Sequence, residues 1–157
     1  MSYRVFTQTP DGGIDPALLV RTATRHFEAS LEILSAEEPP TPGAGSARVG
    51  LRLVSARRGF SQDFTLLSRG ASAEDWAAAR RAEENGKSAG MSALAERCRF
   101  IWVIGSESDA PVALLNLCAV LASAALGPVL PPDESALFGV RGAMERVEAL
   151  SGRSLFR

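Results

Sequence analysis

The stretch RFIWVI at residues 99–104 decides the fold, because its last five side chains form a continuous apolar run without alternation. A strand with one wet face alternates apolar and polar side chains, whereas a strand covered on both faces is apolar throughout. We therefore predict that residues 100–104 form the central strand of a sheet that carries helices. The other elements are placed outward from this strand.

Downstream of the central strand, the pattern predicts a helix, a short edge segment and a last helix. Asp109 is an N-cap for an alanine-rich helix over 110–126, which Gly127-Pro128 ends. Val129-Leu130 then begins a short strand-like segment at an edge. Apolar residues recur at helical spacing over 140–150 and predict the last helix.

Immediately upstream, two helical pieces are expected. Ser72 opens a sequence that resembles a capping box, although Asp75 replaces the usual glutamate, and an alanine- and arginine-rich helix follows it. Asn85-Gly86 breaks this helix, and a second helical piece runs to about Arg97. Further upstream, the alternation over 48–56 and again over 60–66 predicts an antiparallel hairpin.

The N-terminal part predicts a strand and a long helix. Residues 3–9 alternate as a strand does. Asp15-Pro16 is an N-cap followed by proline at the first helical position, and apolar residues at helical spacing predict a helix over about 15–35. The stretch at about 37–46 is rich in proline and glycine, so we expect a flexible surface loop there.

Together these elements predict a single α+β domain over residues 1–157, with the order β-α-β-β-α-β-α-β-α. We expect a mixed or antiparallel sheet of about five strands with helices packed on it. A chain of 157 residues with 46% hydrophobic and 22% charged residues is long and apolar enough to build its own core.

Charge and composition disfavour several classes of partner. Lys plus Arg total 17 against 18 for Asp plus Glu, so no excess positive charge attracts nucleic acid. The longest apolar stretch, 110–126, is shorter than a bilayer span, so we expect no membrane association. The chain enters a strand pattern directly after Met1-Ser2, without a secretory leader, and Cys98 and Cys118 have no metal-site spacing. We therefore expect reduced, packed thiols and a cytoplasmic protein.

Catalytic and cofactor motifs are not evident, so we predict no catalytic residue and no cofactor. His26 is the single histidine, and it flanks the apolar stripe of the first predicted helix. No nucleophile motif of the G-x-S-x-G type accompanies it, and the glycine spacing fits neither the P-loop nor the dinucleotide fingerprint. We therefore expect an interaction protein more than an enzyme.

The loop after the central strand is the best-placed candidate for a ligand site. Glu107 and Asp109 lie where open α/β sheets often bind ligands, and His26 is a further candidate for such a pocket. Asp133 and Glu134 are expected to join them if both loops lie at one end of the sheet, which would form an oxygen-rich site for Mg²⁺ or Ca²⁺. Helix capping and loop solubility are the favoured explanation of these acids, and the ligand or metal site is the alternative.

Trp76 and Arg80 are the candidates for a protein-binding surface. Both lie on the alanine- and arginine-rich helix, and tryptophan and arginine are enriched among interface hot spots. The alternative is that Trp76 packs its helix against the sheet.

Residues 100–139, an apolar strand, an Ala/Leu-rich helix and the sequence GPVLPPDESALF at 127–138, resemble uncharacterised bacterial α+β domains near polymorphic-toxin or secretion loci. That resemblance implies an immunity or accessory protein that binds another protein, encoded nearby. Where the pattern has a glycine pair and an apolar strand, this chain has Gly-Pro and a proline pair.

Three functional hypotheses stay open from the sequence. The first is a non-enzymatic protein-binding domain of the immunity or accessory kind. The second is a small enzyme or a ligand- or metal-binding domain that uses the acidic loops beyond the central strand. The third is a self-assembling structural subunit.

Overall fold

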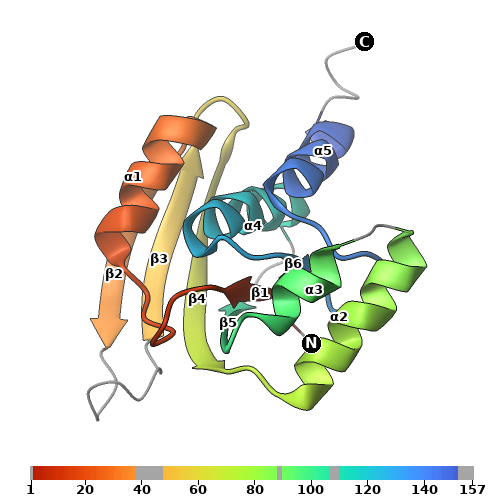
Figure 1. Cartoon of the computed structure of the whole chain (residues 1–157). Helices are drawn as coiled ribbons and strands as arrows, with labels where there is room; N and C mark the ends of the chain where they lie inside the picture. Colours follow the sequence, from red (N-terminus) through yellow and green to blue (C-terminus); the bar gives the residue numbers. More distant parts are fainter. Residues whose placement is uncertain (1, 38–47, 88–89, 107–109, 152–157) are drawn as a thin grey trace.

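The computed structural model describes residues 2–37, 48–87, 90–106 and 110–151 (Figure 1). These residues form an α+β fold in which helices pack on one antiparallel sheet. The elements, in chain order, are β1 (Arg4–Thr7), α1 (Pro16–Phe27), β2 (Ser30–Glu37), β3 (Arg48–Ser55), β4 (Phe60–Gly70), α2 (Ala73–Gly86), α3 (Met91–Glu96), β5 (Phe100–Gly105), α4 (Pro111–Ala125), β6 (Val129–Leu130) and α5 (Val140–Ser151).

The sheet has the strand order β2-β3-β4-β5-β1-β6, and every neighbouring pair in it is antiparallel. The expected α+β class is confirmed, with six strands in the described part of the chain where about five were predicted. β5 lies between β4 and β1, so the predicted central strand is an interior strand. The predicted hairpin is also confirmed, because Ser55 of β3 pairs with Phe60 at the start of β4.

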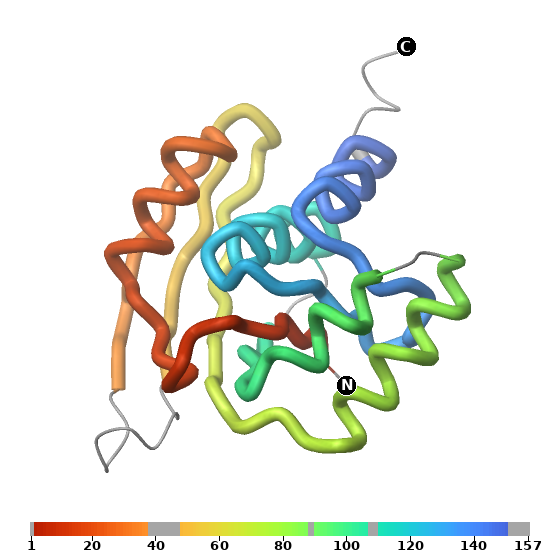
Figure 2. Tube along the Cα trace, viewed as in Figure 1, coloured from red at the N-terminus to blue at the C-terminus, as the bar shows by residue number. Residues whose placement is uncertain are grey.

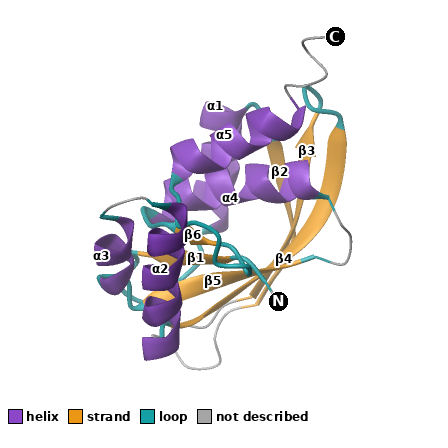
Figure 3. Ribbon diagram, turned by 90° about the vertical axis from the view of Figure 1, so that its right-hand side faces the viewer, coloured by secondary structure: helices purple, strands orange, loops and turns teal. Residues whose placement is uncertain are grey.

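One face of the sheet is covered by α1, α4 and α5, and the larger apolar core lies there (Figure 3). The strands contribute alternate residues to this core, such as Leu51 and Leu53 of β3 and Trp102 and Ile104 of β5. α4 is buried over most of its surface because it lies between the sheet and the two other helices. This arrangement explains why its sequence is apolar almost throughout.

Among the described elements, α2 and α3 cover part of the opposite face. Phe6 of β1 and Ile101 of β5 form a second apolar cluster with the alanines Ala78, Ala79 and Ala82 of α2. Figure 2 shows α2 and α3 at one end of the molecule, far from β2 and β3 at the other. β5 is therefore covered on both faces around Ile101, as its apolar run predicts, whereas Val103 and Gly105 further along it are only half-buried.

The prediction of one helix over 15–35 is wrong beyond Phe27. α1 is capped as expected, because Asp15 accepts hydrogen bonds from the backbone of Ala17 and Leu18 at 3.1 and 3.3 Å. It ends at Glu28, which adopts a left-handed conformation with φ 51°, and the next residues form the edge strand β2. Residues four apart share a face in a helix and also in a strand, so the spacing of Phe27 and Leu31 did not distinguish the two.

The remaining local predictions agree with the structure where it describes them. The capping box at Ser72 is present with Asp75 as its third residue. Of the predicted loop at 37–46, Glu37 ends β2 and the rest lies outside the described residues, as does Asp109, the predicted cap of α4. Among the described residues, no helix is both long enough and apolar enough to cross a membrane.

Candidate functional site

No described helix covers the face of the sheet opposite α1 over β2, β3 and the first part of β4, and we call this region the open half. A hollow of about 950 Å³ lies on it. Two leucines beside the hollow are accessible, since Leu34 is 46% exposed and Leu67 is 44% exposed. Large apolar side chains on an uncovered sheet face are a feature that calls for an explanation.

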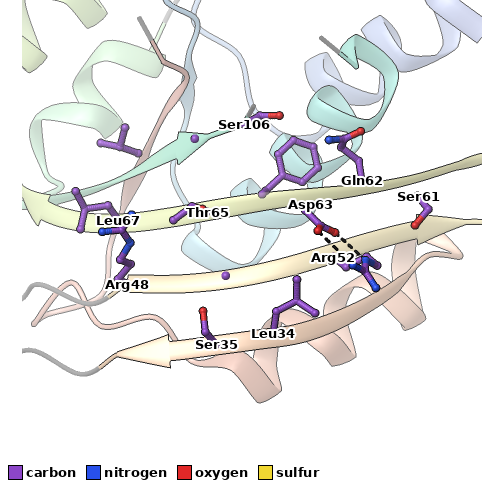
Figure 4. A pocket seen from close by; sticks show the side chains of 14 residues that line it. Leu34, Ser35, Arg48, Arg52, Ser61, Gln62, Asp63, Thr65, Leu67 and Ser106 are labelled. Atoms are coloured by element: carbon purple, nitrogen blue, oxygen red, sulfur yellow. Dashed lines mark hydrogen bonds and ion pairs between the residues drawn. The ribbon is translucent and has the colours of Figure 1, made fainter. Parts of the chain in front are cut away.

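The floor of the hollow is a row of small residues that crosses four strands. The strand register places Ser35 beside Gly50, Gly50 beside Thr65, and Thr65 beside Gly105. A Cβ atom at Gly50 would lie 2.6 Å from the hydroxyl oxygen of Ser35, so a larger residue there would require the Ser35 side chain to rotate away. Small residues in register produce a depression because the neighbouring rows carry long side chains (Figure 4).

One side of the depression is a charged row in which Arg52 is paired. Its Nε lies 2.7 Å from Oδ1 of Asp63, and its Nη2 lies 3.2 Å from Oδ2 (Figure 4). The hydrogen bond from Arg52 lowers the pKa of Asp63, and Glu32 lies opposite Arg52 on β2. Because both side chains are exposed, this ion pair fixes the position of the two side chains but contributes little to the free energy of unfolding.

The other side is formed by Arg48, Leu67, Val103 and Arg4, which the register places side by side on β3, β4, β5 and β1. We call these four residues the arginine row. Two apolar side chains lie between two cations, and three strand spacings put the ends of the row about 14 Å apart. Arg48 forms no ion pair with any residue that the structure describes.

At one end of the arginine row, Arg4 shares a buried carboxylate with Arg69. Arg4 Nη1 lies 2.8 Å from Oδ1 of Asp75, and Arg69 donates through Nη1 at 2.8 Å and Nη2 at 2.9 Å. Asp75 also accepts from the backbone N–H and the hydroxyl of Ser72, at 2.8 and 3.0 Å. Burial by itself raises the pKa of Asp75, but the hydrogen bonds from Arg69, Ser72 and Arg4 outweigh it and hold this pKa well below its usual range.

This network attaches α2 to the sheet, because Asp75 is on the first turn of the helix while Arg4 and Arg69 are on β1 and β4. A second hollow, of about 410 Å³, is lined by both arginines and by Val103. Val103 also lines the larger hollow, so the two hollows adjoin. The open half and the two arginines therefore form one continuous surface.

Of the three residues predicted from the sequence as a ligand site, the structure describes His26. Glu107 and Asp109 lie outside the described residues. His26 is exposed on the last turn of α1, where its ring packs edge-on against Phe27 with centroids 6.4 Å apart.

The two other acids proposed for a metal site already have partners. Glu134 accepts two hydrogen bonds from Arg81, at 2.7 and 3.1 Å, and Asp133 accepts from the backbone of Ser135 at 3.0 Å. No group of three or more potential metal ligands occurs among the described residues. Convergence with Glu107 and Asp109 stays a prediction.

The two residues predicted as a protein-binding surface have local roles in the structure. Trp76 is half-buried against the second apolar cluster, and its Nε1 donates to the carbonyl of Cys98 at 3.2 Å. Arg80 is exposed and forms an ion pair with Glu96, the last residue of α3. The helix face that carries them therefore packs α2 and α3 together, and it does not line the open half.

Two kinds of buried polar group lie away from the open half. Cys98 and Cys118 are buried free thiols, and burial raises the pKa of both, that of Cys98 to about 11. Asn116 of α4 is completely buried, and neither atom of its amide has a hydrogen-bond partner among the described residues. A thiol in such surroundings is a poor nucleophile.

The polarity of the outward-facing strand residues is a sequence signal for the open half. The outward positions of the hairpin are Gly50, Arg52, Asp63 and Thr65, which are small or charged, whereas the outward positions of β1 and β5 include Phe6 and Ile101. A wet face is polar and a covered face is apolar. This difference shows which strands lack a cover, although it does not identify what binds there.

No family model, no curated protein and no solved structure matches the chain. The resemblance of residues 100–139 to toxin-associated domains therefore stays a prediction. The function has to be argued from the geometry of the open half.

Proposed function

We propose that this chain is a non-enzymatic protein-binding domain that holds its partner on the open half of the sheet. The observation that carries the proposal is the hollow across β2 to β5, flanked by Leu34 and Leu67, on the part of the face that α2 and α3 leave open. Apolar side chains left accessible on one contiguous region are typical of interaction sites.

The shape of the hollow favours a protein over a small molecule. Its floor is an open sheet, and its lining is spread over four strands with accessible leucines on it. Small-molecule sites bury about 70–90% of their ligand, which requires walls on several sides. The acid among the described lining residues, Asp63, is bound by Arg52, so it is not poised for acid–base chemistry.

The finer proposal is that the partner is a toxin or a component of a secretion system and that this chain is its immunity or accessory protein. Its support is the resemblance of residues 100–139, together with a binding face in place of a catalytic cluster. It predicts a one-to-one complex with a protein encoded nearby.

The experiment compares capture from a lysate of the source cells by the tagged wild-type chain and by Leu67→Asp. We expect one protein to be retained in stoichiometric amount by the wild type and lost with Leu67→Asp, because a carboxylate would be desolvated in the interface. Leu150→Asp is the matched control, since Leu150 is 49% exposed on α5, away from the open half. Retention of the partner by Leu67→Asp, or repeated failure to recover any partner, would contradict the proposal.

A further inference from the structure

We infer that the partner presents to the arginine row a protein segment with two carboxylates about 14 Å apart and an apolar side chain between them, an inference that rests on the proposed function. The carboxylates bind Arg48 at one end and the Arg4–Arg69 pair at the other. The apolar side chain lies on Leu67 and Val103.

The charge available along the open half is the first support for an acidic segment. Arg48 makes no ion pair within the described part of the chain, although Glu37 lies opposite it in the register of β2. Arg4 and Arg69 carry two positive charges against the single negative charge of Asp75, while Glu134, which lines the same smaller hollow and whose pKa Arg4 helps to lower, binds mainly to Arg81. Arg4 binds Asp75 through Nη1 alone, and its other guanidinium nitrogens have no partner among the described residues.

The opposite wall of the hollow offers no such charge. Arg52 is held in a two-point contact by Asp63, with Glu32 beside it, and this wall is therefore neutral or slightly acidic. In the smaller hollow, Glu134 is bound by Arg81, which reduces its repulsion of an incoming carboxylate. Carboxylates are thus attracted to one side of the depression only, which would also orient the bound segment.

The apolar part of the row is the second support. Leu67 is 44% exposed and Val103 is half-buried, and they are neighbours in register with one arginine beyond each of them. In an extended segment, residues two apart point to the same side and each residue advances the chain by about 3.3 Å. An acidic residue, an apolar residue and a second acidic residue at every other position therefore match the length of the row.

The probes are three fluorescein-labelled peptides with the central sequences Glu-Ser-Leu-Ser-Glu, Lys-Ser-Leu-Ser-Lys and Glu-Ser-Ser-Ser-Glu. Fluorescence anisotropy should show saturable binding of the first peptide and much weaker binding of the other two. Arg48→Glu should weaken the first peptide about tenfold or more, as expected for the loss of a hydrogen-bonded charge contact. Leu67→Ser should weaken it as well, and should reduce its advantage over the peptide without leucine.

Arg141→Glu is the matched control, because Arg141 is a highly exposed arginine on α5 and belongs to a surface pair with Glu145. It should leave binding unchanged. Arg69→Gln tests the far end of the row, with circular dichroism to verify the helices, since Arg69 also holds Asp75. Arg48→Glu needs no such check on α2, so the inference stays falsifiable if Arg69→Gln unfolds that helix.

Equal binding of the acidic and basic peptides, equal binding without the leucine, or no effect of Arg48→Glu would overturn the inference. So would a dimer of the free protein that Leu67→Asp dissociates in analytical ultracentrifugation, because a second copy would then occupy the face. If Leu67→Asp abolishes capture of the natural partner but no acidic peptide binds, this inference fails and the proposed function stands. If the peptide binds as expected but Leu67→Asp keeps the partner, the proposed function fails instead.

Discussion

The covered and open halves of one sheet face differ in sequence as well as in exposure. Where α2 lies on the sheet, the strands present Phe6 and Ile101, and the helix presents alanines that allow close approach. Where no described helix lies, the strands present small and charged residues such as Gly50 and Arg52. A helix on the second region would bury little apolar area and would desolvate charges, so the same sheet has one half that stabilises the fold and one that is free to bind.

The largest expected contrast is between Phe6→Ala and Leu67→Ala. Phe6 is completely buried, so its truncation should lower the free energy of unfolding by about 3–5 kcal/mol. Leu67 already contacts water, so Leu67→Ala should cost less than about 1 kcal/mol. Urea denaturation monitored by circular dichroism measures both, and similar losses would show that the two halves do not differ as described.

Asp75→Asn tests the boundary between the halves, where Arg4 and Arg69 meet α2. Removing the carboxylate leaves two guanidinium groups unpaired, and we expect a loss of about 2–4 kcal/mol at pH 7. Because the folded-state pKa of Asp75 is depressed, its contribution is present above its ordinary value of 3.8 and is lost as the pH falls below that value. The gap in stability between wild type and variant should therefore narrow in acid.

Asp63→Asn is the control for that experiment, since the Arg52–Asp63 pair on the open half is exposed. It should leave the denaturation midpoint almost unchanged at every pH. A gap between wild type and Asp75→Asn that stayed constant from pH 7 to pH 3 would rule out the linkage of Asp75 to stability.

Asn116→Leu asks whether the fully covered face is optimised for stability. A buried amide without partners among the described residues costs free energy that leucine would not, so the variant should be more stable by about 1–2 kcal/mol. Asn116→Asp should be destabilised instead, because a charge would be buried. A loss of stability with leucine would contradict the prediction.

Thiol labelling compares the accessibility of the covered and open halves, and we expect the Thr65→Cys substitution that it requires to change the stability very little. Cys98 lies in the covered cluster, and burial raises its pKa to about 11, so iodoacetamide should modify it only when the protein opens. A thiol introduced by Thr65→Cys, on the floor of the hollow, should react in the folded protein. Protection of that thiol by the partner, measured by mass spectrometry, would locate the docked segment, and slow labelling in the free protein would contradict an open face.

The sequence predicted the elements whose signals are local. The apolar run of β5, the alternation of β3 and β4 and the cap at Ser72 each depend on residues a few positions apart, and the structure confirms them. The prediction that the first helix continues past Glu28 was wrong. The segment after Glu28 instead pairs as β2 with β3, and this pairing joins residues that are distant along the chain. Hydrogen bonds to a distant strand outweighed a helical spacing that was ambiguous.

The candidate site was harder to predict than the fold. Residue type and position within single elements are what the sequence offers for predicting a site. They point to Trp76, Arg80, Glu107, Asp109 and His26. Arg48 and Arg4 are 44 positions apart, and only the order of β3, β4, β5 and β1 places them in one row. No spacing along the chain reports such a row.

By itself, the sequence determined that the chain forms an α+β fold around residues 100–104. A strand that is buried on both faces has apolar side chains throughout, and this pattern is visible in the sequence. Only the tertiary structure decided which residues of distant strands lie in one row and which charged groups they meet. Covering and pairing depend on contacts between distant segments, and in those contacts Asp75 compensates one of two arginines while Arg48 has no partner in the described structure.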